Sequence, residues 1–371
     1  MASRYWVLAI SGSWNGDNTG KWAATSGGLA GEAEPTRFDD VFFDANSGTN
    51  TVTITTVEGR CQSLNTTGYT GTLAFGSRGL FVGSESSLGN FTLGSGMAGG
   101  TIAGGQTITF ISTTAGTNNI TLNGITLQQN ITFNGVGGAW TLQDALTQTT
   151  NAPGITVTNG TFNTNGKTVT ALDLAIPGGG SPVLTLGAST VNLTGDSSTG
   201  TVLSFGASIT FNTNTSTIVF TNTTANAKLF DGGGYTFNNF NITGGGAGIV
   251  TISGSNTFAN LPQIVGGTKN LRFTAGTTQT YTGGTDFGNG ANLITIDTQT
   301  GGSAATLSKA SGTVQVTSIS LKDSTAAGGA VWKAPSNNGN IDVSGNTGWV
   351  FTPVGGGGAG VQQNMLLLGV G

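Results

Sequence analysis

The chain has 371 residues, of which 65 are Gly and only 8% are charged, and its formal net charge is −4. A hydrophobic fraction of 36% with so little charge excludes a disordered chain, and the absence of a Gly-X-Y period excludes collagen. The chain contains no His and one Cys, which excludes His-based catalytic triads, His-ligated metals, an internal disulfide and a Cys-based zinc site.

The same composition limits the partners. A net negative charge predicts that the chain binds no nucleic acid, since such binding needs a basic face. The apolar stretch 5–10 is too short for a signal peptide, and the run 365–368 is far too short to span a bilayer, so we expect no export signal and no membrane insertion. We expect Cys61 to be a buried packing residue, because no His is present to activate its thiol.

Residues 1–48 are predicted to form an N-terminal cap. Trp6, Trp14 and Trp22 lie in this segment together with many of the chain's carboxylates. A stack of repeated coils exposes its core at both ends, so bulky capping residues belong there.

Residues 49–324 are predicted to form a parallel β-solenoid. Short runs alternate β-branched or aromatic residues with Thr, Asn or Ser and end in Gly or Asn, which is typical of half-buried strands joined by turns; examples are 51–54, 107–110, 130–133, 155–158 and 209–212. No stretch shows a helical period. One sandwich core of this size would be very large and would need charged edges, whereas each coil of a solenoid pairs with its neighbours.

The spacing of Phe residues gives the length of one coil. Phe91, Phe110 and Phe133 recur at intervals of about 19 and about 23 residues, and a second series, Phe211, Phe237 and Phe258, recurs at about 26 and about 21 residues. These intervals predict coils of roughly 20 to 25 residues and about 13 coils in all.

The end of the chain is predicted to close the solenoid and to assemble. Residues 325–353, with Trp332 and Trp349, form a closing cap, and 354–371 form a Gly hinge followed by an apolar tail. We expect the tail to dock on a partner chain. The expected assembly contacts are Trp6, Trp14, Val361, Met365, Leu366, Leu367 and Leu368.

Motifs at the two ends resemble a known class of chains. RYWV at 4–7, GSW at 12–14 and DDVFFD at 39–44 are similar to the start of β-solenoid proteins of phage particles, and GNTGWVF at 345–351 is similar to their last coil. The resemblance implies a right-handed parallel β-helix in a phage virion component, often a trimer.

Carboxylates that could act on a polysaccharide are few. Asp173 and Asp196 are separated by about one coil length, so they could stack as a pair, and Asp231 lies further along. Glycoside hydrolysis needs two such carboxylates about 5 to 9.5 Å apart. Each is also an ordinary turn residue, and sugar-binding aromatic residues are scarce in mid-chain, so no catalytic residue is assigned.

No metal or cofactor site is assigned either. Asp39, Asp40 and Asp44 could hold a cation through oxygen ligands, but we expect them to cap turns or to pair with Arg4 or Arg37. The segment 283–290 resembles one calcium-binding repeat, but it occurs only once in this chain, whereas such repeats bind calcium as stacked arrays. The Gly run 178–180 lacks the Gly-Lys-Ser/Thr ending of a phosphate-binding loop.

These observations predict a non-enzymatic structural component of a bacteriophage particle, such as a capsid decoration, tail or fibre protein. It would assemble in the host cytoplasm into the virion, as a homo-oligomer (a trimer is favoured) and with other virion proteins. One alternative is a host-glycan-binding fibre or adhesin located outside the cell or at its surface. The other is a tailspike-type polysaccharide depolymerase.

Overall fold

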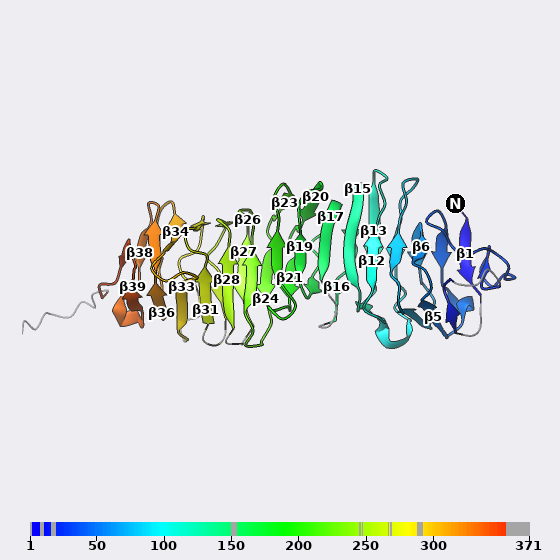
Figure 1. Ribbon diagram of the computed structural model, residues 1–371, viewed down its shortest axis with the longest axis horizontal. Helices are drawn as coiled ribbons and strands as arrows, with labels where there is room; N and C mark the ends of the chain where they lie inside the picture. Colours follow the sequence, from blue (N-terminus) through cyan, green and yellow to red (C-terminus); the bar gives the residue numbers. More distant parts are fainter. Residues whose placement is uncertain are drawn as a thin grey trace, which may run out of the picture.

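The computed structural model describes residues 2–7, 11–15, 20–149, 154–244, 246, 248–265, 267, 269–287 and 292–353. Within these ranges the chain forms short β-strands and three single-turn 3₁₀ helices, η1 (Ala45–Ser47), η2 (Ala98–Gly100) and η3 (Ser336–Asn338), and no α-helix. The predicted all-β class is confirmed. The strands stand side by side along an elongated molecule, with β1 near one end and β39 near the other (Figure 1).

The strands form three sets of parallel ladders. Ladder II is continuous from β6 to β39 and holds β6 (Gly59–Cys61), β9 (Leu80–Val82), β12 (Thr107–Phe110), the first halves of β15 (Asn130–Leu142) and β17 (Ile155–Asn163), β19 (Leu174–Ile176), β22 (Leu203–Phe205), β25 (Lys228–Asp231), β28 (Ile249–Ser253), β31 (Lys269–Phe273), β33 (Ile294–Thr298), β36 (Ile319–Lys322) and β39 (Ile341–Ser344).

Ladder I follows ladder II along the chain in each repeat. Its N-terminal section holds β1 (Ser3–Trp6), β4 (Asp40–Phe42), β7 (Ser63–Asn65), β10 (Phe91–Thr92), β13 (Thr117–Thr121), the second halves of β15 and β17, β20 (Pro182–Thr185) and β23 (Thr210–Asn212). The same place in the repeat is then taken by β26 (Thr236–Phe237), β29 (Thr257–Phe258), β32 (Thr278–Tyr281), β34 (Ala305–Lys309) and β37 (Ser324–Ala327).

Ladder III completes the repeat and is built in several pieces. They are β2 (Gly12–Ser13), β5 (Thr51–Ile54) and β8 (Thr72–Phe75); β11 (Thr101–Ile102) and β14 (Thr126–Leu127); β16 (Leu146–Thr147), β18 (Val169–Ala171), β21 (Thr190–Leu193), β24 (Thr217–Phe220), β27 (Asn239–Ile242) and β30 (Gln263–Ile264); and β35 (Thr313–Gln315), β38 (Val331–Lys333) and β40 (Trp349–Val350).

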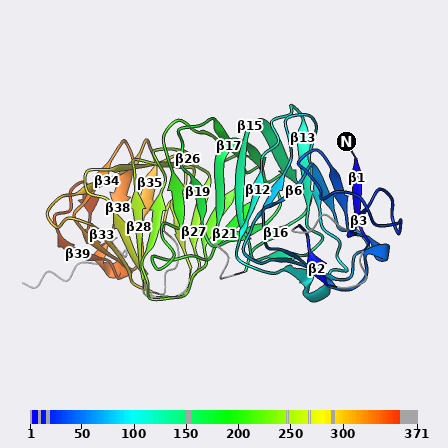
Figure 2. The ribbon, with the colours of Figure 1, turned by 45° about the vertical axis from the view of Figure 1, so that its right-hand side comes forward.

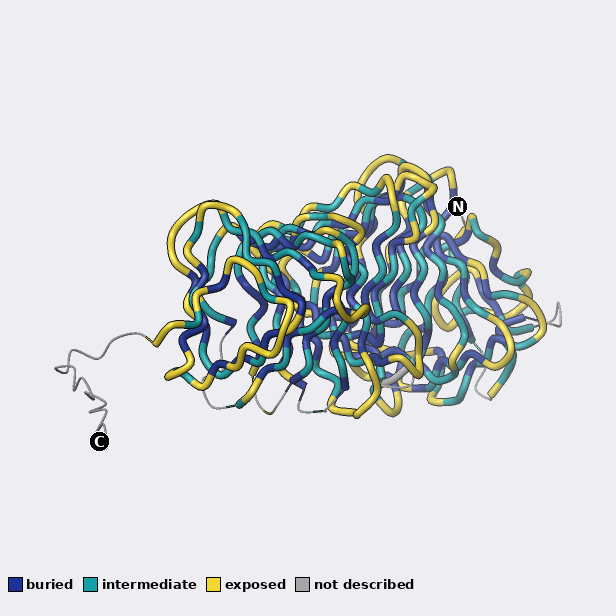
Figure 3. Tube along the Cα trace, turned by 60° about the vertical axis from the view of Figure 1, so that its left-hand side comes forward, coloured by how far each residue is buried: buried dark blue, intermediate teal, exposed yellow. Residues whose placement is uncertain are grey.

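The chain visits the ladders in the fixed order II, I, III, and this arrangement is compatible with a β-solenoid (Figure 2). On ladder II the shortest step between register partners runs from Ile155 to Leu174, and the longest runs from Leu174 to Leu203. The coils are therefore more variable in length than the Phe spacing predicted. Their length changes mainly in the loops, where exposed backbone is concentrated (Figure 3).

Alternation along each strand places every second side chain in the core. The inward column of ladder II stacks aliphatic residues in direct register and at most 3% exposed: Ile108, Ile131, Ile155, Leu174 and Leu203. Each such burial stabilises the fold by about 1.5–3 kcal/mol relative to exposure.

Aromatic rings also stack in the core, both within ladder II and between ladders II and I. The centroids of Phe110 and Phe133 are 5.1 Å apart, and Phe133 lies 4.3 Å from Phe162. Phe91 belongs to ladder I whereas Phe110 belongs to ladder II, so the interval between them does not correspond to the coil that the spacing predicted. Phe237 and Phe258 are true register partners. A Phe spacing in sequence therefore mixes two ladders.

The N-terminal end is closed by an antiparallel strand. β3 (Trp22–Ala23) pairs with β1 in the opposite direction. The Trp22 ring lies 5.3 Å from the rings of both Trp6 and Trp14. Trp6 and Trp14 are at most 1% exposed, so both side chains pack in the core at this end; their role as assembly contacts stays a prediction.

Candidate functional site

A buried polar region lies where ladder III turns into ladder II. Two successive loops, 194–202 and 221–227, stack there with the described residues 243, 244, 246 and 248 of the next loop. They bring together Asp196 with Lys228 and Lys269, the first residues of β25 and β31. Asp196 is 4% exposed, Lys228 3% and Lys269 2%. Ionised side chains this deeply buried require partners.

Asp196 is surrounded by hydrogen-bond donors. Its Oδ1 accepts bonds from the backbone N–H of Ser198 at 2.9 Å and from the Ser198 hydroxyl at 2.5 Å. Its Oδ2 accepts bonds from the Thr224 hydroxyl at 2.5 Å and from the side-chain amides of Asn226 at 3.2 Å and Asn222 at 3.4 Å. The bonds from Ser198 and Thr224 hold the pKa of Asp196 well below its usual range. The carboxylate is therefore an ionised anchor of the loops and not a proton donor.

The two lysines bind loop carbonyls. Lys228 Nζ donates to the backbone oxygens of Thr224 at 2.7 Å and Asn226 at 2.9 Å. Burial lowers the pKa of Lys228, and the nearby charge of Asp196 opposes this shift. An inward-facing ammonium thus satisfies carbonyls that a turn leaves without strand partners.

Lys269 has the same role in the next loop of the stack. Its Nζ donates to the backbone oxygens of Gly244 and, at 3.0 Å, Gly246. Burial and repulsion from Lys228 lower the pKa of Lys269. Sequence reasoning missed both lysines, although a signal was present: in the alternation of β25 and β31 each occupies an inward position.

An open pocket of about 370 Å³ lies beside Asp196 and is lined by Leu172, Thr194, Gly195, Asp196, Ser198, Thr199, Asn222 and Thr224. Its walls carry hydroxyl and amide groups and one carboxylate. Such a lining could hold a hydroxyl-rich ligand, but both oxygens of the carboxylate are already occupied.

Asp173 and Asp196 stack through their backbones only. The N–H groups of Thr194 and Gly195 donate to the carbonyls of Ala171 at 2.9 Å and Leu172 at 2.8 Å, so the expected one-coil relation holds for the main chain. The Asp173 side chain lies against Gly154 of the preceding coil, whereas the Asp196 side chain binds the following coil.

The two carboxylates therefore point away from each other along the stack. Burial raises the pKa of Asp173 to about 6, and a bond from the Gly154 backbone partly offsets this rise. Asp231 ends β25, in register with Ser204 and Ser253 of neighbouring strands. The geometry brings none of the three predicted carboxylates together as a pair.

Two of the N-terminal carboxylates, Asp39 and Asp44, cap turns, as expected, and the third, Asp40, bonds across two strands. Asp39 accepts bonds from the backbone and the hydroxyl of Thr36 at 2.9 and 2.7 Å. Asp44 caps η1 through the backbone N–H of Asn46 at 2.9 Å, and Asp40 accepts a bond from Ser63 at 2.5 Å.

Of the two expected alternatives, turn capping is therefore the one that the structure shows, and Arg4 and Arg37 pair with glutamates instead. Arg4 Nη1 lies 3.4 Å from Glu32 Oε2, and Arg37 Nη2 lies 2.8 Å from Glu85 Oε1. Among the residues that the structure describes, no three His, Cys, Asp or Glu side chains gather as a metal site.

The remaining predicted residues divide into two groups. Cys61 is fully buried, as expected, and burial raises the pKa of its thiol. Residues 288–290 of the calcium-like segment lie outside the described ranges, as do the tail residues Val361, Met365, Leu366, Leu367 and Leu368.

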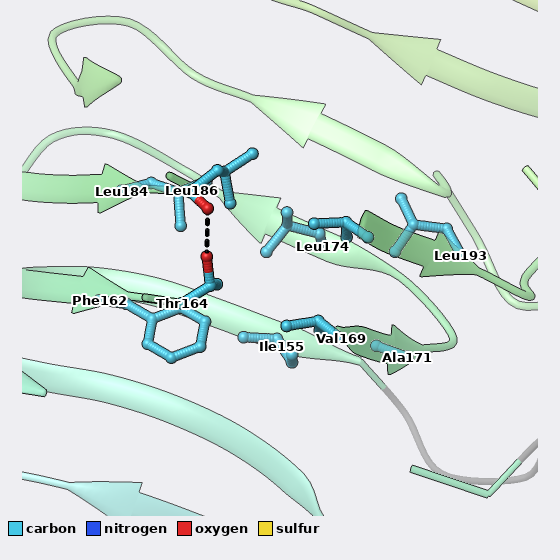
Figure 4. A pocket seen from close by; sticks show the side chains of 10 residues that line it. Ile155, Phe162, Thr164, Val169, Ala171, Leu174, Leu184, Leu186 and Leu193 are labelled. Atoms are coloured by element: carbon cyan, nitrogen blue, oxygen red, sulfur yellow. Dashed lines mark hydrogen bonds between the residues drawn. The ribbon is translucent and has the colours of Figure 1, made fainter. Parts of the chain in front are cut away.

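A second cavity lies inside the core, between the ladders (Figure 4). It measures about 10 Å³ and is walled by aliphatic and aromatic side chains such as Ile155, Phe162 and Leu184. The Thr164 hydroxyl at its edge donates to the carbonyl of Leu186 at 2.9 Å. A space of this size holds at most one water molecule, so it is a packing gap.

No helix in the described ranges is both long and apolar enough to cross a bilayer. No family model matches the chain, and neither the curated proteins nor the solved structures contain a match.

Proposed function

We propose that the chain is a non-enzymatic structural component of a bacteriophage particle, built as a closed, right-handed parallel β-solenoid. It assembles with copies of itself, as a trimer, and with other virion proteins. The terminal motifs RYWV and GNTGWVF support the phage origin by resemblance. The parallel ladders and their fixed order of visits support the solenoid.

The observation that carries the structural role is a long uncharged face on ladder I. Its outward residues form a column in direct register: Asn119, Thr141, Asn163, Thr185 and Asn212. Neighbours in the column bond to one another, as where the Asn212 amide donates to the Thr185 hydroxyl at 3.1 Å. A rigid face without charges packs against another molecule with little loss of ion hydration.

The test places charges on this face. Sedimentation of the full chain should show an oligomer, and the double variant Thr141→Lys, Thr185→Lys should dissociate it. Thr132→Lys, on the outward side of ladder II, is the matched control and should leave the oligomer intact. A wild-type chain that stays monomeric at every concentration and is missing from a map of the intact particle would refute the proposal.

A host-glycan-binding fibre is the second candidate, and the pocket beside Asp196 favours it because hydroxyl and amide groups line its walls. Specific binding of the purified chain to host surface polysaccharide would support this role. Release of oligosaccharides during that assay would instead indicate a depolymerase.

A further inference from the structure

Edge strands lie at both ends of the stack. At the N-terminal end of ladder I, the edge of β1 is covered by β3. At the other end β39 pairs with β36 on one side, and no described strand pairs with its other side. All four residues of β39 are exposed. An open sheet edge exposes a row of backbone donors and acceptors, which proteins normally cover or protect.

The last strands of the stack carry exposed apolar side chains. Ile341 is 48% exposed, Val343 52%, Val350 40% and Val331 46%. They come from the last strands of ladders II and III, β38, β39 and β40. An exposed apolar group beside an unpaired edge is a binding surface or an aggregation site.

The register of ladder II indicates what covers the edge. The shortest step between register partners on ladder II, from Ile155 to Leu174, is 174 − 155 = 19 residues, and the longest, from Leu174 to Leu203, is 203 − 174 = 29 residues. A further coil within these limits places the register partner of Ile341 between positions 360 and 370. The sequence there, 361–368, is VQQNMLLL, which carries no charge. The preceding Gly run 355–358 allows the chain to turn back toward ladder II.

We propose that residues 361–368 of the same chain bind the open edge of β39 as the next parallel strand of ladder II. The added strand would cover Ile341 and Val343 and pair the exposed backbone groups of β39. In the order II, I, III, the strand that follows β40 of ladder III belongs to ladder II, which is the place that residues 361–368 would take. The tail thus binds its own chain, whereas the tail sequence alone suggested docking on a partner chain. The proposal does not depend on the assembly face on ladder I.

Hydrogen exchange of the full-length chain, followed by mass spectrometry, tests the proposal. In the wild type the amides of 342–344 should be protected, and the variant Leu366→Asp, Leu367→Asp should exchange them about tenfold faster or more. The conservative variant Leu366→Met, Leu367→Met should keep the protection. Leu29→Asp is the matched control, because Leu29 is 95% exposed in the N-terminal segment, before β4, and its change should leave β39 unaffected.

Measuring exchange at several protein concentrations distinguishes a strand from the same chain from a strand supplied by a second copy. Protection by the same chain does not depend on protein concentration, whereas protection by the tail of a second copy falls on dilution and accompanies a dimer in sedimentation. Concentration-independent protection that the Asp variant removes supports the proposal. Protection lost on dilution, or equal exchange in the wild type and the Asp variant, would overturn it.

Discussion

Replacing Asp196 with Asn tests whether the polar corner stabilises the stack. Asn has nearly the same shape as Asp, but it has no charge, and one of its two terminal atoms is a donor. In the native corner both carboxylate oxygens accept bonds, with the shortest from the hydroxyls of Ser198 and Thr224 at 2.5 Å. The Asn side chain therefore places an amide N–H₂ group where one set of donors already points.

The expected loss is about 3 kcal/mol in the free energy of unfolding. A hydrogen bond to a charged group contributes about 1.5–3 kcal/mol, and at least one short bond is lost outright while the others weaken. The buried ammonium of Lys228 also loses the favourable charge of Asp196. Both effects act in the same direction.

Denaturation in guanidinium chloride measures this change, with Asp231→Asn as the control. Asp231 is partly exposed at the end of β25, and its replacement should change the free energy of unfolding by no more than about 0.5 kcal/mol.

The pKa of Asp196 is lower in the folded than in the unfolded chain, so its stabilisation is fully present above about pH 4 and is lost as pH falls through the folded pKa. The difference between wild type and variant should therefore shrink in acid. A loss below about 1 kcal/mol at pH 7, or a difference that does not change with pH, would refute this account.

Two further predictions concern glycines and pH. Gly104 has φ +93° and a Cβ added to it would lie 1.8 Å from the Phe75 carbonyl, so Gly104→Ala should lower the free energy of unfolding by at least about 1–3 kcal/mol. Gly105→Ala, with no atom within 4 Å of its Cβ, should cost little in the same chemical denaturation, and equal losses in the two variants would contradict the steric explanation. The raised pKa of Asp173 means that its ionisation destabilises the fold as pH rises from about 4 through 6. Asp173→Asn should therefore be more stable than the wild type at pH 7 and equal to it below pH 4, and a variant that is less stable at pH 7 would contradict the burial argument.

Local rules predicted much of the fold. The alternation at 107–110 and 130–133 correctly identified strands, because a period of two is written in neighbouring residues. The turn-capping roles of Asp39 and Asp44 also followed from sequence, since their partners are close neighbours along the chain. The pairing of Arg4 with Glu32 and of Arg37 with Glu85 could not be predicted, because these partners approach each other only through folding.

The sequence by itself determined the β class and the burial of Cys61, which depend on composition and on short periods. Only the tertiary structure decided which ladder each strand joins, as for Phe91 and Phe110, and in which direction Asp173 and Asp196 point. The physical reason is loop length. Coils as unequal as the one from Ile155 to Leu174 and the one from Leu174 to Leu203 shift the register by amounts that no local pattern records. Two side chains one coil apart in sequence can therefore contact different coils, as Asp173 contacts the preceding coil and Asp196 the following one.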